Sequence, residues 1–236
     1  MIRKRMISIA ALSALVLAAS ALAGSGDRRQ VGGVLLTTSQ PNASSGLDFA
    51  VDYRNPDDPQ AKPPAVRKVV SMLPKHARYD TRAPGLCRAS DAELIALGAA
   101  ACPANSKLTD GVITVDTGVP GPGRFIISDT TFLNNEDELI YVNTARDTDA
   151  RVIVRAEVRR RRIITESPPL PGAPPDGAAI DTVSVHFPAI SSARGNYITT
   201  PRRCPPRGYW VTKIRFRYAD GVRQVERDRN PCRGGR

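Results

Sequence analysis

Residues 209–218 of the 236-residue chain have the sequence Tyr-Trp-Val-Thr-Lys-Ile-Arg-Phe-Arg-Tyr, the clearest strand pattern in the protein. Side chains of a β-strand point to alternate faces, so a period of two separates an apolar face from a charged one. One face contains Trp210, Thr212, Ile214, Phe216 and Tyr218, and the other contains Val211, Lys213, Arg215 and Arg217. The pattern predicts an amphipathic strand with one face on a core.

A hairpin is expected directly after this strand. Asp220-Gly221 is a sequence that favours a tight turn between antiparallel strands. Cys204 lies 16 residues before Asp220, and Cys232 lies 11 residues after Gly221. Antiparallel pairing brings the two ends of such a hairpin together, so we expect a Cys204–Cys232 disulfide.

The other two cysteines flank a short predicted helix. Ser90 and Glu93 have the spacing of a capping box, and Gly98 is a helix stop. We therefore expect a Cys87–Cys102 disulfide that pins this helix, the local geometry choosing among the three possible connectivities. A metal site is the alternative, but the spacings typical of zinc ligands are absent, so no metal is predicted.

The first 23 residues have the features of a secretory signal peptide. Basic residues 3–5 precede an uncharged run from Met6 to Ala23 that ends in Ala21-Leu22-Ala23. The alternative is an uncleaved membrane anchor, since about 18 uncharged residues is the lower limit for a span. We expect an exported protein, extracellular or associated with the cell envelope, with no membrane span after signal cleavage.

The net charge of +11 carries little functional information. Cleavage after Ala23 would remove three basic residues and leave 31 basic against 23 acidic residues. All but six of the 34 basic residues are Arg, a bias expected of a GC-rich genome. Basicity alone therefore does not predict nucleic-acid binding.

The rest of the chain alternates short strand patterns with turn residues. We predict an all-β fold, an antiparallel β-sandwich of Ig-like or jelly-roll-like type, with one short disulfide-pinned helix. Residues 24–45 are expected to be a flexible lead, and residues 46–236 a single domain with a proline-rich surface loop at 167–177. The expected strands besides the one above are 47–53, 66–73, 111–116, 124–133, 138–144, 151–164, 179–187 and 197–200.

A further set of stretches is distinctive, above all the sequences around the four cysteines: residues 62–66, 73–74, 86–94, 101–106, 204–205, 208–210, 220–221 and 231–232. Together they resemble a family of exported actinobacterial proteins with paired cysteines and no established biochemical function. The resemblance covers residues 62–116 and 204–232 well and the middle of the chain loosely. It implies the same two disulfides and a β-rich export domain, and no catalytic residues.

Chemistry-bearing motifs are few. The chain has two histidines, His76 and His186, and no serine lies in a G-x-S-x-G motif. The acidic turns 136–138 and 147–149 lack the pattern of a twelve-residue Ca²⁺ loop. No catalytic residue, metal or cofactor is predicted.

The densest charge is the run Arg159, Arg160, Arg161 and Arg162, with Arg155 on the same predicted strand. As a stripe it would attract a polyanion by counterion release. The alternative is a strand end that charge keeps soluble and protects from edge pairing. We take these five arginines as candidate polyanion-binding residues.

These features together predict a non-catalytic binding or structural module of the cell envelope, with an unknown ligand. Its expected partner is an anionic cell-wall polymer or another envelope protein. The alternative is a secreted hydrolase acting on glycans or esters, because paired carboxylates are not visible in a sequence.

Overall fold

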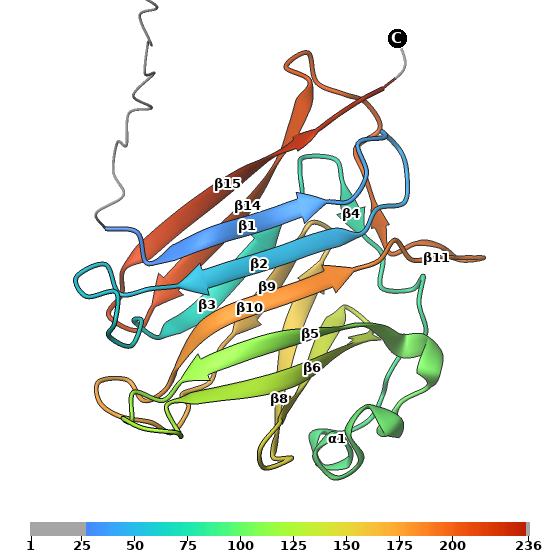
Figure 1. Ribbon diagram of the computed structural model, residues 1–236. Coiled ribbons are helices and arrows are strands. Elements are labelled where there is room, and N and C mark those ends of the chain that lie inside the picture. Colours follow the sequence, from blue (N-terminus) through green and yellow to red (C-terminus); the bar gives the residue numbers. More distant parts are fainter. Residues whose placement is uncertain (1–26, 235–236) are drawn as a thin grey trace, which may run out of the picture.

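The computed structural model describes residues 27–234, which form one large antiparallel sheet of eleven strands (Figure 1). The sheet curls until its two end strands, β1 (Gln30–Leu36) and β15 (Arg223–Pro231), contact each other. The predicted antiparallel all-β sandwich with one short helix is confirmed, and both of its layers belong to this sheet. The predicted signal peptide, residues 1–23, lies outside the described residues.

Strands from both sides of the proline-rich loop belong to the same sheet. In spatial order they are β1, β2 (Leu47–Tyr53), β10 (Ala179–Phe187), β5 (Lys107–Asp116), β6 (Phe125–Asn135), β7 (Glu138–Ala145), β8 (Arg151–Arg159), β9 (Arg162–Glu166), β3 (Val66–Met72), β14 (Tyr209–Tyr218) and β15. Two short pairs join β4 (Arg78–Tyr79) to β13 (Ile198–Thr199) and β11 (Ser191–Ser192) to β12 (Gly195–Asn196).

The prediction of a flexible lead at residues 24–45 is wrong for Gln30–Leu36, which forms β1. This strand pairs with β2 along its whole length, and its Val34 side chain is completely buried. Gly32 and Gly33 interrupt the alternating pattern from which a strand would be predicted. Because glycine has no side chain, the Ala50 carbonyl and the Asp228 carboxylate can approach the backbone closely at these two positions.

The predicted strand 151–164 is also wrong in one respect, because it is two strands. β8 ends at Arg159, the chain turns at Arg160 and Arg161, and β9 begins at Arg162. The two strands pair as a tight hairpin. The arginine run is therefore a turn and not a continuous stripe.

The core lies inside the curled sheet. The apolar face predicted for residues 209–218 is buried at every position from Trp210 to Tyr218. Aromatic rings meet edge to face across the interior, Tyr53 with Phe216 at 5.9 Å and Phe132 with Phe187 at 5.1 Å between centroids. The alternation of apolar and polar residues in the sequence thus places the apolar side chains in the interior of the sheet.

The helix α1 (Asp91–Leu97) lies outside the sheet and contacts β8. The predicted capping box of Ser90 and Glu93 is present, and Gly98 ends the helix with a φ of 62°. The 3₁₀ turns η1 (Gly98–Ala101) and η2 (Ala104–Ser106) follow. Both predicted disulfides are confirmed, and the first of them packs beside α1 in a small second apolar cluster.

Side chains of β15 close the gap between the end strands. Asp228 Oδ2 accepts a hydrogen bond from Val34 N at 2.9 Å, and Asn230 Oδ1 accepts one from Leu36 N at 2.6 Å. Thr212 Oγ1 on β14 donates to Val34 O at 2.5 Å. The end strand β1 thus has its backbone groups paired by side chains where no further strand pairs with it.

Candidate functional site: an apolar cavity

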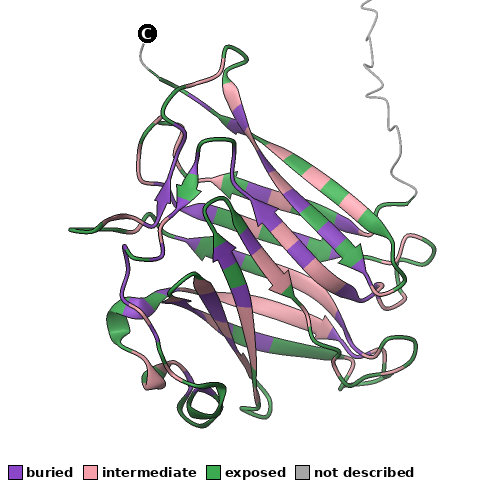
Figure 2. Ribbon diagram, turned by 180° about the vertical axis from the view of Figure 1, so that it is seen from behind, coloured by how far each residue is buried: buried purple, intermediate pink, exposed green. Residues whose placement is uncertain are grey.

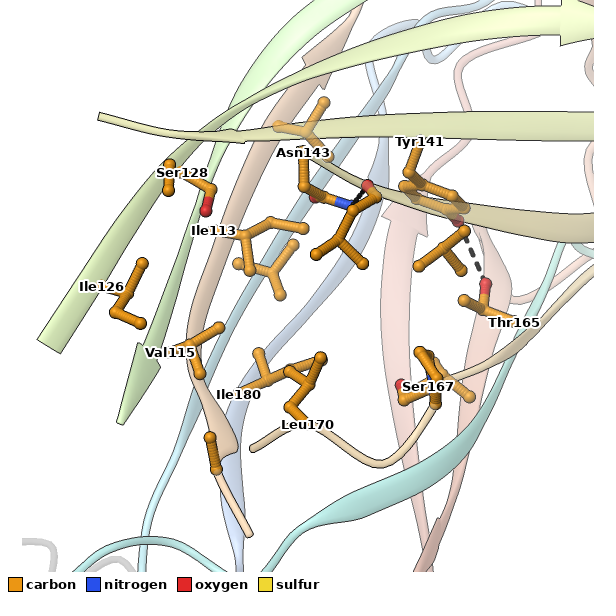
Figure 3. A pocket seen from close by; sticks show the side chains of 18 of the residues that line it. Ile113, Val115, Ile126, Ser128, Tyr141, Asn143, Thr165, Ser167, Leu170 and Ile180 are labelled. Atoms are coloured by element: carbon orange, nitrogen blue, oxygen red, sulfur yellow. Dashed lines mark hydrogen bonds between the residues drawn. The ribbon is translucent and has the colours of Figure 1, made fainter. Parts of the chain in front are cut away.

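A cavity of about 620 Å³ lies inside one end of the curled sheet. Its walls are the inward side chains of strands β2, β3 and β5 to β10, and three loops contribute residues at its open end. Figure 3 shows an aliphatic side of Ile113, Val115, Ile126, Leu170 and Ile180 and a second side with Tyr141, Thr165 and Ser167.

The sequence leaves this end of the interior incompletely filled. Where the core is packed, large side chains such as Phe216 and Tyr218 are buried, but near the open end of the cavity Phe125 is 45% exposed and Val152 is 42% exposed. In Figure 2 the long strands at the bottom of the view are largely coloured as intermediate or exposed. Apolar groups that face each other across water-accessible space can take up an apolar molecule.

Polar groups of the cavity are few and mostly engaged. The Tyr141 hydroxyl lies 3.0 Å from Thr165 Oγ1 (Figure 3), and burial raises the pKa of Tyr141 to about 12. Ser71 Oγ is buried beside the Tyr79 hydroxyl without a hydrogen bond of good geometry. These neutral groups can donate to or accept from a ligand, and none of them supplies charge.

The lining contains no Lys, Arg or His, and Asp147 is its only acidic residue. A buried carboxylate or phosphate without a cationic partner is strongly disfavoured. The cavity is therefore suited to neutral molecules, or to the uncharged part of a larger one.

The proline-rich loop forms part of the open end of the cavity through residues that include Leu170 and Pro171. Its conformation is held by Lys62, whose Nζ donates to the carbonyls of Ala173 at 2.5 Å, Pro175 at 2.9 Å and Gly177 at 2.5 Å. All three ammonium protons are thus used on one loop. A segment predicted only as a surface loop is a fixed wall of the site.

Of the five predicted polyanion-binding residues, Arg155 is engaged in contacts that stabilise the fold. Its guanidinium pairs with Asp91 and Glu138, each at 2.7 Å, and donates to Ala89 O at 2.8 Å. It therefore ties the segment around α1 to the sheet. Arg159 pairs with Glu157 at 2.5 Å, and Arg161 donates to Leu73 O at 3.1 Å.

Arg160 lines a second hollow of about 590 Å³, whose walls carry both signs of charge. Arginines and carboxylates alternate there, and Arg82 is bound to Asp80 at 3.2 Å. Polyanion binding by the predicted run stays a prediction. The charged residues around this hollow are Arg78, Asp80, Arg82, Glu136, Asp137, Arg159 and Arg160.

The two histidines are exposed, and neither lines the cavity. His186 Nδ1 is 2.5 Å from Asp48 Oδ1 across the β10–β2 pair, and His76 is exposed in a turn. Within residues 27–234, no group of three or more His, Cys, Asp or Glu side chains is placed to hold a metal ion. The hydrolase alternative stays a prediction.

Comparison of the chain with protein-family models, with curated proteins and with solved structures finds no match. The resemblance to exported actinobacterial proteins thus stays a prediction. In the described part of the chain, no helix has both the length and the apolar character that crossing a membrane requires.

Proposed function

We propose that the protein is an exported, non-catalytic binding module whose ligand is a neutral apolar molecule held in the cavity. The observation that carries the proposal is the apolar lining of a space of about 620 Å³ inside an otherwise packed sheet. Ligand sites of soluble proteins have volumes of roughly 300 to 1,000 Å³ and mostly apolar walls with a few polar groups. Export rests on the signal-peptide pattern and agrees with the two disulfides.

The exposed side chains at the open end support binding over a purely structural role. Protein interiors are normally close-packed, and apolar side chains left beside water lose the stabilisation that burial would provide. A ligand between Ile126 and Val152 would restore that burial. The loop contacts of Lys62 keep this end in a defined shape, which reduces the entropy lost when a ligand binds.

The absence of cations from the lining narrows the ligand class. A fatty-acid carboxylate inside the cavity would meet no positive charge, and near the open end it would meet Asp147. A long-chain alcohol of the same length carries a neutral head that a hydroxyl such as that of Ser71 or Tyr141 can bind. We expect the alcohol to bind more tightly than the acid.

The test uses N-phenyl-1-naphthylamine, a neutral dye whose emission rises in apolar surroundings. Ile126 lines the cavity, whereas its neighbour Ile127 does not, and each is 38% exposed. Ile126→Trp should weaken dye binding by about tenfold or more because the indole fills the cavity, and Ile127→Trp should leave it within about twofold. Equal dye binding by the two variants would refute the proposal.

Displacement of the dye then tests the ligand class. Hexadecanol should displace it at lower concentration than hexadecanoate at neutral pH. Tighter binding of the hexadecanoate would overturn the assignment to neutral ligands while leaving the cavity as the site.

A further inference from the structure

A cationic face lies on the outer surface of the sheet. It consists of side chains of β9, β14 and β15 that point away from the core. Residues that pair directly in an antiparallel sheet project to the same side, so the register shows which side chains are neighbours. Arg159 pairs with Arg162, which pairs with Met72; Met72 pairs with Lys213, and Lys213 with Arg227. One row across five strands thus carries four cations.

A second row lies four residues further along β9, β3, β14 and β15. Glu166 pairs with Lys68, Lys68 with Arg217, and Arg217 with Arg223. Arg215 lies between the two rows on β14. In Figure 2 the exposed bands along β15, at the upper right, alternate with less exposed ones, as expected of side chains that project outward at every second position. We define the cationic face as Arg162, Lys213, Arg215, Arg217, Arg223 and Arg227.

This arrangement opposes folding. Like charges directly opposite one another on neighbouring strands are destabilising, and the face contains the pairs Lys213/Arg227 and Arg217/Arg223, with Lys68/Arg217 and Arg159/Arg162 beside them. Among residues 27–234, the six residues of the cationic face form no salt bridge. The neighbours Lys68 and Arg159 do, with Glu166 and Glu157.

An ordinary solvated surface intersperses both signs of charge. Like-charge neighbours that form no salt bridge of their own are expected where a surface serves binding. An anionic partner placed over the face would remove the repulsion and release counterions from its own charges. The positive charge of the face therefore predicts a negatively charged partner.

The composition of the face specifies the partner further. Five of its six residues are Arg, and the planar guanidinium binds phosphate oxygens in bidentate fashion. Alternate residues of a strand are about 6.8 Å apart and neighbouring strands about 4.8 Å apart, so the cations form a grid that an extended polymer can follow. A compact monovalent anion would use only one point of this grid.

Two other kinds of anionic partner fit less well. Tyr209 is the one aromatic side chain that projects from this side of β14 and β15, and the guanidinium groups of Arg207 and Arg229 lie 5.0 and 4.9 Å from its ring centroid. The Tyr209 ring is therefore already covered by guanidinium groups and is not available for stacking on nucleic-acid bases. The apolar side chains between the cations are Met72, which is buried, and branched aliphatic residues such as Val70 and Val225, without the Trp, Phe or Leu that insert into a bilayer.

We propose that the cationic face binds a linear phosphate-bearing polymer through the charges of its backbone. The face is on the outer surface and shares no residue with the cavity, so this site is independent of the proposed apolar ligand. The predicted arginine run contributes one residue, Arg162, to it.

The probe is fluorescent inorganic polyphosphate, titrated with the full mature protein at several salt concentrations. The triple variant Lys213→Gln, Arg215→Gln and Arg217→Gln removes three charges from the face. Binding should weaken by about tenfold or more, and the slope of log K against log salt should become shallower by about 2, since each lost contact contributes about 0.7. The matched control replaces three exposed arginines that form no salt bridge among the described residues, Arg88, Arg194 and Arg202, with Gln.

Equal loss of binding in the control variant, or no binding by the wild type, would overturn the proposal. Polyglutamate and vesicles containing anionic phospholipid form the other two arms, and equal or tighter binding of either would overturn the assignment to a phosphate polymer. The triple variant should melt no lower than the wild type because repulsion is relieved. If it fails to fold, Arg223→Gln with Arg227→Gln tests the same face from β15. Dye binding in the cavity should be unchanged in all these variants.

Discussion

Asp228 Oδ2 accepts a hydrogen bond from the backbone N–H of Val34 at 2.9 Å, between strands that lie at opposite ends of the sheet order. The contact joins residues 194 positions apart in the chain. Asn230 of β15 accepts a hydrogen bond from Leu36 N in the same way, and Thr212 of the neighbouring strand β14 donates one to Val34 O. The sheet is therefore closed by side chains and not by a backbone ladder.

Replacing Asp228 with Ala should destabilise the protein by about 1–3 kcal/mol, because the buried Val34 N–H then has no acceptor. Asp228→Asn keeps an acceptor oxygen at the same position and should retain most of the stability. Urea unfolding of both variants measures the difference. A loss of stability in the Asn variant as large as in the Ala variant would show that the hydrogen bond is unimportant.

The charge of Asp228 should make this closure sensitive to pH. Burial raises the pKa of the Asp228 carboxyl, Glu226 raises it further, and the Val34 N–H opposes them. The folded state then binds the proton more tightly than the unfolded state, so the free energy of unfolding falls as pH rises through the carboxyl range. We expect the stability of Asp228→Asn relative to the wild type to increase between about pH 4 and neutral pH. A difference that does not change with pH would contradict this.

Gly33 should be required for the same contact. A Cβ at this position would lie 2.2 Å from Asp228 Oδ2 and 2.4 Å from its Cγ. Gly33→Ala should destabilise the protein by roughly 1–3 kcal/mol through overpacking, and by less when Asp228 is already Ala. Gly123→Ala, where a Cβ meets no heavy atom within 4 Å, is the control. Additive effects of the Gly33 and Asp228 changes would argue against a direct clash.

Features set by neighbouring residues could be predicted from the sequence. The capping box of Ser90 and Glu93, the Asp220-Gly221 turn and the buried face of residues 209–218 depend on contacts a few positions apart. Each disulfide could be predicted because its cysteines flank one such local element. Local periodicity and turn residues were therefore largely sufficient to predict the fold class.

Features set by pairing between distant strands could not be predicted. β1 needs β15 as well as β2, and the partners on β15 are polar side chains that follow no apolar period. The cavity depends on which inward side chains fail to meet one another, which no single strand shows. The alternation of Lys213, Arg215 and Arg217 was visible in the sequence, but their proximity to Arg162 and Arg227 follows only from the register.

The contacts of Lys62 give the last prediction, on how the cavity is closed. Lys62→Met keeps the length of the side chain but removes the charge that binds Ala173 O, Pro175 O and Gly177 O. Hydrogen bonds from a charged donor are worth about 1.5–3 kcal/mol, so amide exchange in residues 168–178 should accelerate by roughly tenfold or more with little change in global unfolding. Because Leu170 and Pro171 line the cavity, dye release should accelerate too. Lys75→Met, at an exposed lysine without a side-chain hydrogen bond in the described chain, should alter neither rate, and unchanged loop exchange in Lys62→Met would show that other contacts hold this wall.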